Sequence, residues 1–536
     1  MSILDKDKYS KSINTVRCKD KILKQTDLID KVRQATKANC RIVVCHGHFN
    51  VLHPGHLRFL QYASEQGDQL LVAVLGDKLL IGEEKKRYFS QSERAEGVAA
   101  LQSVDWVVIL DEICFDKVID IVKPSVYVLG KEFEKDHAEK VRQNIVQVKA
   151  NNGKVIFCSG DVQYASADFL YHPYEEIEHD RVQKFQEALQ RHDIELERLE
   201  YYISQFQRLK LAVIGDTIVD QYVACDALGM SAEAPVIAVK ELETKEFIGG
   251  ASIVASHLRS LGAQCHYFSV VGDDQPGQFV REQLTKVELN HCLFVDNGRP
   301  TTFKIRYMVN NQKLFRVSRL HDNSISKELE SQIISRLKQL AQQLDGIIIS
   351  DFVYGVISDS LLSSIIRIAR KNKIKLFGDL QCSTQVGNVL KFKQFDFICP
   401  TEREARLALS DHESGLEKLA LNILKLTKTT NLLITLGTDG FVAHQTANGS
   451  KVIKSQHFPA LISNPVDVVG AGDALLSVAS ISQCSGASLM EASALGTCAA
   501  AIAVNRIGNN PVTATELVNF IRKSMAYVPN SQPLNE

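Results

Sequence analysis

The sequence predicts an α/β protein built from two doubly wound domains, and three observations lead to this prediction. Its 536 residues exceed what one ordinary hydrophobic core accommodates. Short apolar runs rich in β-branched residues, often followed by glycine, occur in two separate regions. Amphipathic helical stretches separate these runs. Such alternation is typical of βαβ units, which assemble into parallel sheets.

The first region predicts five strands before the chain becomes uniformly charged. They are RIVVCHG (41–47), QLLVAVLG (69–76), DWVVIL (105–110), SVYVLG (125–130) and KVIFCSG (154–160). The second region opens with KLAVIGDTIVD at residue 210. Its further strand candidates are GIIIS, IKLFGD, FDFICP and NLLITLG. Its length of more than 300 residues suits one large doubly wound domain.

These patterns predict four segments along the chain. We expect an N-terminal helical extension over residues 1–38 and a first α/β domain over 39–172. A charged helical linker over 173–207 then leads to a second α/β domain over 208–530. The linker has helical spacing and favours a solvated connecting helix. A helix that packs the two domains or a dimer together is the alternative.

The composition indicates which binding partners and which cellular compartment we expect. A net charge of -1, from 62 basic and 63 acidic residues, predicts neither nucleic acid nor an anionic membrane as the main partner. No apolar run approaches the ~20 residues that span a bilayer, and the polar N-terminus lacks a signal-peptide apolar region. The twelve cysteines form no CxxC pair, which favours reduced thiols in a cytoplasmic protein.

Four histidines fall within CHGHFNVLHPGH, residues 45–56. Their spacings of two, five and three do not match HExxH, and no nearby acid or cysteine completes an obvious metal site. Histidines that merely pack in the core are a second interpretation. The third is an anion site, because Pro54 suits the first turn of a helix and His53 and His56 would lie at its N-terminus. Free N–H groups and the helix dipole attract phosphate there.

This segment resembles the signature of the HxGH nucleotidyltransferases, which include cytidylyltransferases and the adenylyltransferase of ADP-heptose synthesis. The resemblance continues through GDQLLVAVLGDK, SERAEGVAALQSVDWVVILDE and VKPSVYVLGKEF, and it covers residues 41 to about 170. It implies a Rossmann-like domain in which His53 and His56 are the catalytic, phosphate-binding histidines. The nucleotide-binding residues that it implies are Gly47, Phe49, Asn50, Arg94 and Ser166. Asn50 and His48 differ from the residues that the family most often has at these positions. The base of the nucleotide and the acceptor substrate therefore stay open.

DVVGAGDALLSVA, residues 467–479, is the second informative motif. Gly470, Ala471 and Gly472 allow the backbone to approach a ligand closely just before an apolar helix, and their N–H groups would form an anion hole. Asp473 would accept a proton from an attacking hydroxyl at the same point. In isolation, a glycine turn with an aspartate helix cap is the favoured explanation of such a motif.

The motif resembles the GAGD signature of the ribokinase-like sugar kinases, the phosphofructokinase B family. VIGDTIVDQYV, IGGASIVASHLRSLGAQ, CPTEREARLAL and ITLGTDGF occur in the family's order over nearly the whole second region. The resemblance implies that Asp473 is the catalytic base beside the Gly470–Gly472 anion hole. Glu404 would organise Mg²⁺ around ATP, near Thr435 and Gly437. Asp216, Asp220, Gly249 and Gly250 would bind the sugar.

Three residues depart from the kinase pattern. Ile253 stands where the family supplies an asparagine to a sugar hydroxyl, and losing such a partner costs about 1 to 3 kcal/mol. Tyr354 replaces a lysine expected near the substrate phosphate, and Thr401 replaces the asparagine of the NxxE stretch. These changes predict kinase chemistry with an altered substrate. They also leave open a non-catalytic domain that senses sugar.

Together the two domains resemble the bifunctional enzymes that make ADP-heptose precursors of lipopolysaccharide, in reversed order. The resemblance implies phosphorylation of a heptose phosphate at C1 and AMP transfer to a heptose 1-phosphate, with ATP as substrate and Mg²⁺ as cofactor. ATP and sugar phosphates are the implied partners, and a homodimer is left open. A CTP-dependent transferase acting on a polyol phosphate is the alternative within the first domain.

Overall fold

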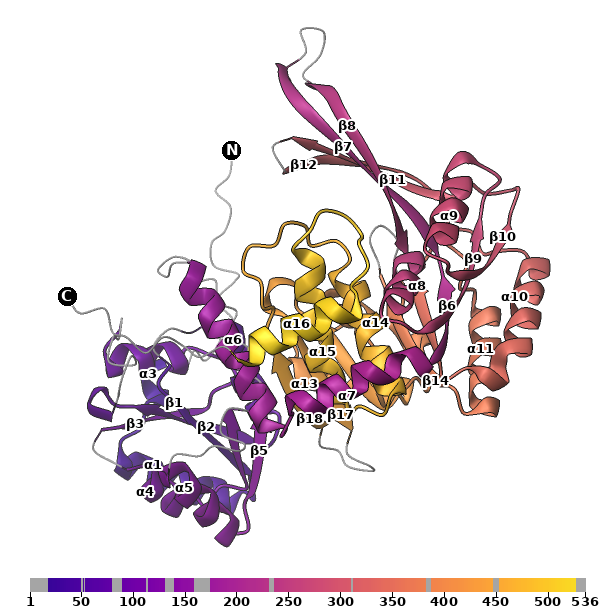
Figure 1. Cartoon of the computed structure of the whole chain (residues 1–536). Helices are drawn as coiled ribbons and strands as arrows, with labels where there is room; N and C mark the ends of the chain where they lie inside the picture. Colours follow the sequence, from indigo (N-terminus) through magenta and orange to yellow (C-terminus); the bar gives the residue numbers. More distant parts are fainter. Residues whose placement is uncertain are drawn as a thin grey trace, which may run out of the picture. The chain divides into compact units, whose positions relative to one another are not determined.

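The computed structural model describes residues 18–49, 52, 54–79, 89–111, 114–130, 139–158, 174–230, 236–309, 312–381, 387–446 and 453–526. The chain forms two compact units. Met1–Tyr164 and the short segment Glu413–Lys418 belong to the first, and Ala165–His412 with Leu419–Glu536 belong to the second. Each unit contains its own sheet, coloured indigo to purple and magenta to yellow in Figure 1.

The first unit contains a parallel sheet in the order β3-β2-β1-β4-β5. The strands are β1 (Ile42–Gly47), β2 (Gln69–Leu75), β3 (Trp106–Leu110), β4 (Val126–Gly130) and β5 (Lys154–Cys158). All five predicted strands of this region are therefore confirmed. The helices are α1 (Gln25–Lys37), α2 (Pro54–Ser64), α3 (Gln91–Ala99), α4 (Phe115–Val122) and α5 (Glu139–Ala150).

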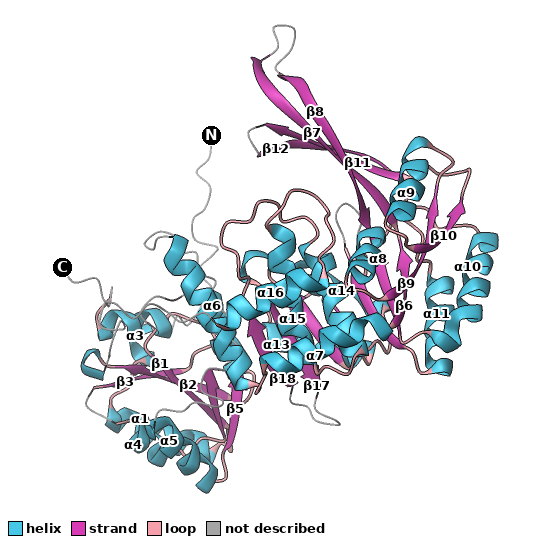
Figure 2. Cartoon of the chain, viewed as in Figure 1, coloured by secondary structure: helices cyan, strands magenta, loops and turns pink. Residues whose placement is uncertain are grey.

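Helices cover both faces of this sheet, as Figure 2 shows. Successive side chains of a strand point to opposite faces of the sheet, so alternate residues pack against the helices on one face or the other. Val44 packs in a cluster with residues of α1, α4 and α5, whereas Val43 packs with residues of α2 and α3. The helix expected in the N-terminal extension is α1. Its buried Leu28 belongs to the first cluster, so α1 is part of the core of this unit.

The larger sheet of the second unit has the order β10-β9-β6-β13-β14-β15-β16-β17-β18. Neighbours from β10 to β16 run parallel, and β17 and β18 are antiparallel additions. The strands are β6 (Lys210–Gly215), β9 (Gln264–Val271), β10 (Asn290–Val295), β13 (Gly346–Asp351), β14 (Lys375–Leu380), β15 (Phe397–Ile398), β16 (Asn431–Thr435), β17 (Phe441–Thr446) and β18 (Ile453–Phe458). The strands predicted in this region are confirmed.

Most helices of this unit follow the βαβ pattern. They are α8 (Ala251–Ser260), α9 (Gln275–Lys286), α10 (Lys327–Leu340), α11 (Asp359–Asn372), α12 (Glu402–Leu409), α13 (Leu416–Thr427), α14 (Ala471–Cys484), α15 (Leu489–Val504) and α16 (Ala514–Met525). Apolar residues of α8, α14 and α15 pack with Leu211, Val213 and Ile348 of the sheet in one large cluster. α15 is buried along nearly its whole length.

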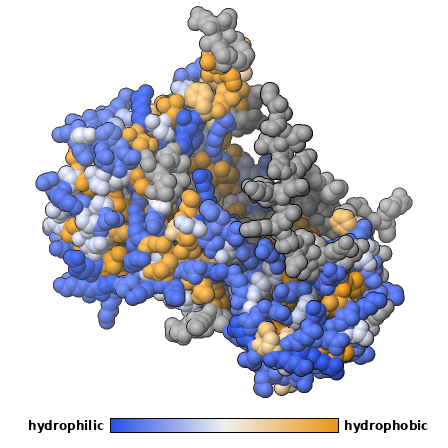
Figure 3. Space-filling model, turned by 180° about the vertical axis from the view of Figure 1, so that it is seen from behind, coloured by the Kyte–Doolittle hydropathy of each residue, from blue (hydrophilic) through white to orange (hydrophobic). Residues whose placement is uncertain are grey.

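A separate four-stranded sheet has the order β12-β11-β7-β8 and projects from the second unit (Figure 1). Its strands are β7 (Thr217–Met230), β8 (Ile237–Gly250), β11 (Thr302–Val309) and β12 (Gln312–Arg319). β7 and β8 form a long antiparallel pair, and β11 runs parallel to β7. Leu228, Ile237 and Leu242 are exposed apolar residues on this pair, and Figure 3 shows apolar residues gathered at that end of the molecule.

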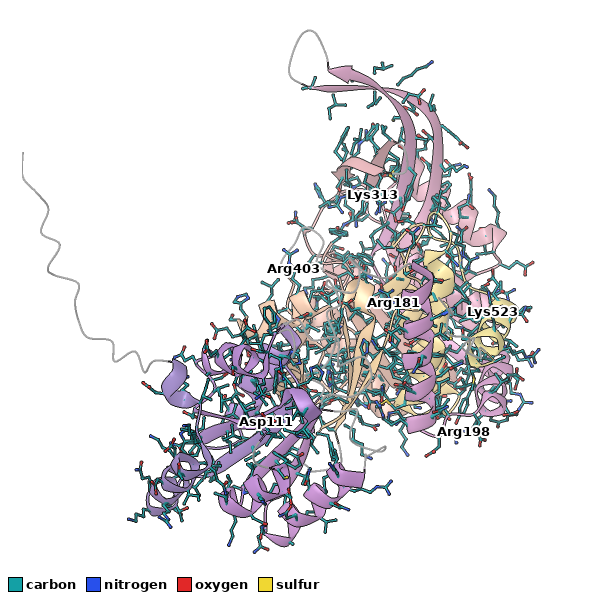
Figure 4. All side chains as sticks on the ribbon, turned by 90° about the vertical axis from the view of Figure 1, so that its left-hand side faces the viewer. Asp111, Arg181, Arg198, Lys313, Arg403 and Lys523 are labelled. Carbon is teal, nitrogen blue, oxygen red and sulfur yellow. The ribbon has the colours of Figure 1, made fainter. Side chains whose placement is uncertain are left out.

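The segment expected to be a solvated linker packs on the second unit instead. It forms α6 (Tyr174–Arg191) and α7 (Leu196–Gln205), whose Phe185 and Leu199 lie in the large core cluster. Arg181 donates to the carbonyls of Ala460 and Ile462 at 3.1 and 3.0 Å, and Figure 4 labels it with Arg198 of α7. The charged residues that suggested a linker form one face of the helices, while the periodic apolar residues are buried.

Among the described residues, no helix has both the length and the apolar character that crossing a bilayer requires. Nine cysteines of the described residues are free thiols: Cys40, Cys45, Cys114, Cys225, Cys265, Cys292, Cys399, Cys484 and Cys498.

Candidate active sites

The candidate site of the first unit lies where β1 ends. The sheet order reverses between β1 and β4, and ligands of doubly wound sheets bind outside the carboxyl ends of the strands at such a point. Gly47 is the last residue of β1. A methyl group there would come within 3.0 Å of the ring of buried Phe49, which has a φ of 45°. The glycine thus permits a sharp turn from the strand toward α2.

His56 lies in the first turn of α2 and is 9% exposed. Its ring centroid is 6.3 Å from that of His48 and 5.2 Å from that of Phe49. The structure therefore gathers these rings at a helix N-terminus, where N–H groups and the helix dipole favour an anion. His53, Asn50 and Ser166, also predicted here, lie outside the described residues.

His46 has a different environment and belongs to the core. Its Nδ1 lies 2.9 Å from the Tyr127 hydroxyl, and its ring stacks on Phe115 with centroids 4.7 Å apart. Burial lowers the pKa of His46 to about 4, so its imidazole is neutral near pH 7. The packing interpretation thus holds for His46, and the histidine-rich segment divides between core and site. Within the described part of the chain, no cluster of three histidine, cysteine or acidic residues could hold a metal ion.

Arg94, predicted to bind nucleotide, makes three contacts within the protein. Its Nη2 donates to the Leu75 carbonyl at 2.7 Å and to Asp77 Oδ1 at 3.0 Å, and its Nη1 donates to the His48 carbonyl. The guanidinium therefore ties the end of β1 to the end of β2. In this structure Arg94 fixes the backbone before His56, and nucleotide binding by its guanidinium stays a prediction.

The candidate site of the second unit is centred on the N-terminus of α14. Gly470 precedes this helix with a φ of 85°, which glycine adopts without strain. A methyl group on Gly472 would meet no atom of the described residues within 4 Å, so these residues leave open space over the first turn. Ala471 begins the helix and Asp473 follows in the same turn. The predicted anion hole and the predicted base are thus adjacent, with room for a ligand.

Asp473 is a buried carboxyl with a neutral-range pKa. Burial, reinforced by the charge of Asp220, raises this pKa to about 7, against the opposing effects of Gln381 and Lys304. The Gln381 amide donates to Asp473 Oδ1 at 2.9 Å. A carboxylate with this pKa is suited to accept a proton near physiological pH.

Asp220 on β7 lies in a network that fixes both carboxylate oxygens. Arg306 donates to its Oδ1, and Asn509 Nδ2 donates to its Oδ2 at 3.0 Å. A methyl group on Gly249 would come within 2.4 Å of Oδ2, so only glycine leaves room for this carboxylate. Gly250, with a φ of 65°, then starts α8. The glycine pair therefore permits the turn and places Asp220 beside it.

Asp216, predicted to bind sugar, has a structural role here. Its oxygens accept hydrogen bonds from the backbone N–H groups of Phe352, Tyr354 and Val356 at 2.8, 3.3 and 3.1 Å. Burial and the neighbouring Asp351 raise the pKa of Asp216 to about 6. Through these contacts the carboxyl group holds the loop after β13, and sugar binding by Asp216 stays a prediction.

Lys304 places a positive charge beside Tyr354, which occupies the position where the family resemblance implies a lysine. It lies on β11 opposite Asp220 and is 4% exposed. Its ammonium lies 5.1 Å from the Tyr354 ring centroid and 5.4 Å from that of Phe352. Two aromatic faces thus hold a buried cation close enough to lower the pKa of Asp473. Residues 304 and 354 lie far apart in the sequence and in no common motif, so the sequence alone did not reveal that Lys304 lies beside Tyr354.

Thr401, another of the three positions that depart from the kinase pattern, forms the N-terminal cap of a helix. Thr401 Oγ1 accepts from the Glu404 N–H at 3.2 Å, and the Glu404 carboxylate accepts from the Thr401 N–H at 2.8 Å. This capping box starts α12. Thr401 also forms a bridge with Thr435 at the end of β16, and Gly437 follows with a φ of 65° and open space around it. Glu404, Thr435 and Gly437 are therefore brought together.

Asp379 and Gln381 are site residues that the sequence analysis missed. Gln381 Nε2 bridges Asp379 Oδ2 and Asp473 Oδ1, each at 2.9 Å. Burial and the charges of Glu404 and Asp473 raise the pKa of Asp379 well above its ordinary value. The available signal was their place at the end of the predicted strand IKLFGD, since polar residues there meet other strand ends.

Comparisons with known proteins identify both units. A family model described as pfkB family carbohydrate kinase matches residues 208–515. A second, described as cytidylyltransferase-like, matches residues 44–158. Among solved structures, phosphofructokinase-2 from Escherichia coli has a TM-score of 0.49 at 14% identity and covers 59% of this chain and 99% of its own. A ribokinase from Thermotoga maritima has a TM-score of 0.47 at 19% identity, with coverages of 59% and 99%.

Two curated relatives, each aligned with this chain over more than 300 residues, carry the same name. The bifunctional protein HldE of Desulfatibacillum aliphaticivorans is 31% identical over 339 residues, which covers 62% of this chain and 68% of that protein. The bifunctional protein HldE of Campylobacter jejuni strain RM1221 is 32% identical over 330 residues, with coverages of 61% and 67%. The predicted combination of a nucleotidyltransferase domain followed by a sugar kinase domain is thus confirmed. The chain belongs to the pfkB family of carbohydrate kinases, and its kinase domain follows a cytidylyltransferase-like domain.

Proposed function

We propose that this protein makes a nucleotide-activated sugar in two ATP-dependent steps. The second unit phosphorylates a heptose phosphate at C1, and the first unit transfers AMP onto the resulting type of sugar 1-phosphate. The name of the HldE relatives, a bifunctional protein, supports two activities in one chain. The resemblance of both motif sets to the ADP-heptose synthesis enzymes supports the choice of sugar and nucleotide. The cytoplasm is the proposed compartment.

The position of Asp473 carries the kinase half of this proposal. The carboxylate lies between an open helix N-terminus and the Asp220 network. In the proposed step, Asp473 accepts the proton of the C1 hydroxyl while that oxygen attacks the γ-phosphorus of ATP. The bond between this phosphorus and the β,γ-bridging oxygen breaks, and ADP leaves. The N–H groups at the start of α14 stabilise the charge on the transferring phosphoryl group.

Lys304 supports an acceptor that already carries phosphate. A buried ammonium is costly unless an anion compensates for it. No ion pair joins Lys304 to a carboxylate within the described residues, while its neighbours Asp220 and Arg306 pair with each other. A phosphate monoester on the sugar supplies the missing negative charge. This residue also weakens the sugar-sensor alternative, whose main support was the lysine absent from position 354.

The acidic group around Asp379 fits Mg²⁺. Asp379 and Glu404 would hold the ion, because oxygen donors of buried carboxylates suit this cation and it relieves their mutual repulsion. Bound with ATP, Mg²⁺ supplies charge neutralisation for the phosphates. Two carboxylates would be sufficient, since Mg²⁺ usually keeps several waters and is bound by one or two carboxylates with substrate phosphates.

In the first unit, His56 and the N-terminus of α2 bind the triphosphate. A sugar 1-phosphate oxygen attacks the α-phosphorus, and the bond to pyrophosphate breaks. The imidazole of His56, with that of His53 by resemblance, stabilises the charge that develops on the pyrophosphate. Positioning and electrostatics are sufficient, and no covalent intermediate with the protein is needed. CTP with a polyol phosphate is the second candidate for this unit, because the matching family model is cytidylyltransferase-like.

A direct test assays both products of the full-length protein. ATP or CTP with Mg²⁺ is incubated with a panel of heptose and hexose phosphates and their 1-phosphates, and ADP and pyrophosphate are measured separately. We expect ADP from a heptose phosphate and pyrophosphate from ATP with a heptose 1-phosphate. Pyrophosphate release without ADP from any sugar would contradict the kinase half. Turnover of CTP alone would replace the adenylyl assignment by the cytidylyl candidate.

A further inference from the structure

The loop between α15 and α16 contributes a residue to the kinase site. Two contacts fix this loop: Gly508 N–H donates to Asp467 Oδ2 at 3.3 Å, and Val512 N–H donates to His257 Nδ1 at 3.0 Å. His257 is buried in α8, and Asp467 belongs to the DVVGAGD segment. Asn509 lies between these anchors and is 8% exposed. Its side chain is thus held in place before any ligand binds.

The two ends of the Asn509 amide have different environments. Nδ2 donates to Asp220 Oδ2 at 3.0 Å, and it lies 2.8 Å from where a methyl group on Gly249 would be. Oδ1 is buried and accepts no hydrogen bond from any described residue. It faces Gly470, on which a methyl group would come within 2.9 Å of it. Exchanging oxygen and nitrogen would place Oδ1 against the Asp220 carboxylate, so the contact with Asp220 fixes this orientation.

We propose that Asn509 determines sugar specificity by accepting a hydrogen bond from a substrate hydroxyl at Oδ1. The inference rests on the proposed kinase function and adds a residue to its sugar site. A buried acceptor without a partner costs roughly 1–3 kcal/mol, which a donor from the ligand recovers. Oδ1 faces the glycine that starts the anion hole, and Nδ2 holds Asp220. Asn509 thereby offers the sugar an amide group from the C-terminal part of the chain. Position 253, where the family pattern has an asparagine, holds a buried isoleucine instead.

The chemistry of this position favours a hydroxyl over a phosphate. Oδ1 and the Asp220 carboxylate are both acceptors and repel the oxygens of a phosphate monoester. Neighbouring sugar hydroxyls donate to two such acceptors at once. The phosphate group is instead attracted by Lys304. The site therefore separates a hydroxyl-binding side, with Asn509 and Asp220, from a phosphate-binding side.

The test compares Asn509→Ala with Asn510→Ala in the full-length protein. Asn510 is the neighbouring residue of the same type, but its amide bonds only to local carbonyls, such as that of Ile507 at 2.9 Å. With the best acceptor from a panel of heptose and hexose phosphates, we expect Asn509→Ala to lower kcat/KM about 10- to 100-fold. The KM for ATP and the pyrophosphate-releasing activity of the first unit stay unchanged. Asn510→Ala stays within about twofold of the original protein.

Acceptor analogues that each lack one hydroxyl identify the contact. Removing the hydroxyl that donates to Oδ1 lowers kcat/KM of the original protein but changes that of Asn509→Ala little. Asn509→Ser provides a second variant if thermal unfolding shows that the alanine variant is unstable, and we expect it to show the same loss of selectivity. Equal sensitivity of the original and variant proteins to every missing hydroxyl would overturn the proposal and leave the kinase function intact. An original protein that phosphorylates no sugar overturns the proposed function and this inference together.

Discussion

The two candidate sites differ in how the chain assembles them. In the first unit, His48, Phe49 and His56 come from one strand–loop–helix segment of ten residues. In the second, Asp220, Lys304, Gln381, Asp473 and Asn509 come from five segments spread over almost 300 residues. A site whose residues lie close together in the sequence can be identified from a motif. A site whose residues meet only in the folded chain can be recognised from the sequence only where it includes such a motif. Of the five predictions below, the first two test whether the two sites act separately, and the other three test the kinase site and its supporting helices.

The largest expected effect separates the sites directly. Asp473→Asn preserves the shape of the side chain but removes the base, so we expect ADP formation to fall about 10²- to 10⁴-fold. Pyrophosphate release from a supplied sugar 1-phosphate should be unchanged, and it serves as the internal control. A variant that retains full kinase turnover would remove Asp473 from the mechanism.

The reciprocal change affects the first unit. His53→Ala together with His56→Ala removes the two imidazoles expected at the N-terminus of α2. We expect pyrophosphate release to fall about 10²- to 10³-fold, because groups that stabilise developing charge have effects of this size. Replacing His46 by phenylalanine is a matched control, since that ring packs between Phe115 and Tyr127 in the core. Unchanged pyrophosphate release in the double variant would refute the anion-site assignment.

Lys304→Met sharpens the assignment of the phosphate-binding side. The change keeps the length of the side chain and removes its charge. We expect the KM for a phosphorylated acceptor to rise about 10-fold, roughly what loss of one charged hydrogen bond implies. At a pH well above 7, where Asp473 is ionised in both proteins, activity with the corresponding unphosphorylated sugar should change little. Lys338→Met, on an exposed position of α10, is the control. Equal losses with both acceptors would argue against a phosphate contact.

The pH dependence of the kinase follows from the same residues. Because burial raises the pKa of Asp473 to about 7, its carboxylate form is lost as the pH falls through 7. We expect kcat/KM for the sugar to decrease about tenfold per pH unit below this midpoint. Since Lys304 lowers this pKa, Lys304→Met should move the midpoint upward. A profile that is flat between pH 5 and 8 would contradict an essential base with this pKa.

The smallest predicted effect concerns the helices before the kinase fold. Arg198 of α7 pairs with buried Glu491 of α15, but its own side chain is 47% exposed. Solvent screening limits such a pair, and we expect Arg198→Ala to lower the free energy of unfolding by about 1 kcal/mol. Arg208→Ala, at an exposed position, should have a smaller effect. Chemical denaturation followed by circular dichroism measures both, and equal stabilities would show that the pair contributes nothing.

Hydrophobic periodicity predicted most of the fold because the strands and helices of doubly wound sheets have strong local patterns. It misled at α6 and α7, where many charged residues suggested a solvated linker although Phe185 and Leu199 are buried. The sites were predictable only as far as their motifs extended. Asp473 and the glycines were found, since a helix N-terminus and close backbone approach are local requirements. The structural role of Asp216 was not predictable, because its backbone partners lie about 140 residues away.

Lys304 and Asn509 show most clearly what sequence patterns leave out. We propose that they supply the groups missing at positions 354 and 253, from a strand and a loop distant in sequence. Lysine and asparagine are common surface residues, so only their burial beside Asp220 and Tyr354 marks them as part of the site. A missing motif residue therefore predicts lost function poorly when tertiary contacts can replace its chemistry.

Phosphorus NMR of the complete reaction tests the central claim most directly. The original protein, Asp473→Asn and the double histidine variant are each incubated with ATP, Mg²⁺ and a heptose phosphate, and in parallel with a heptose 1-phosphate. We predict that Asp473→Asn forms no anomeric phosphate but converts the supplied 1-phosphate to a nucleoside diphosphate sugar. The histidine variant should accumulate the anomeric phosphate and stop there. An anomeric phosphate signal from Asp473→Asn at the original rate would contradict two separate sites with these assigned residues.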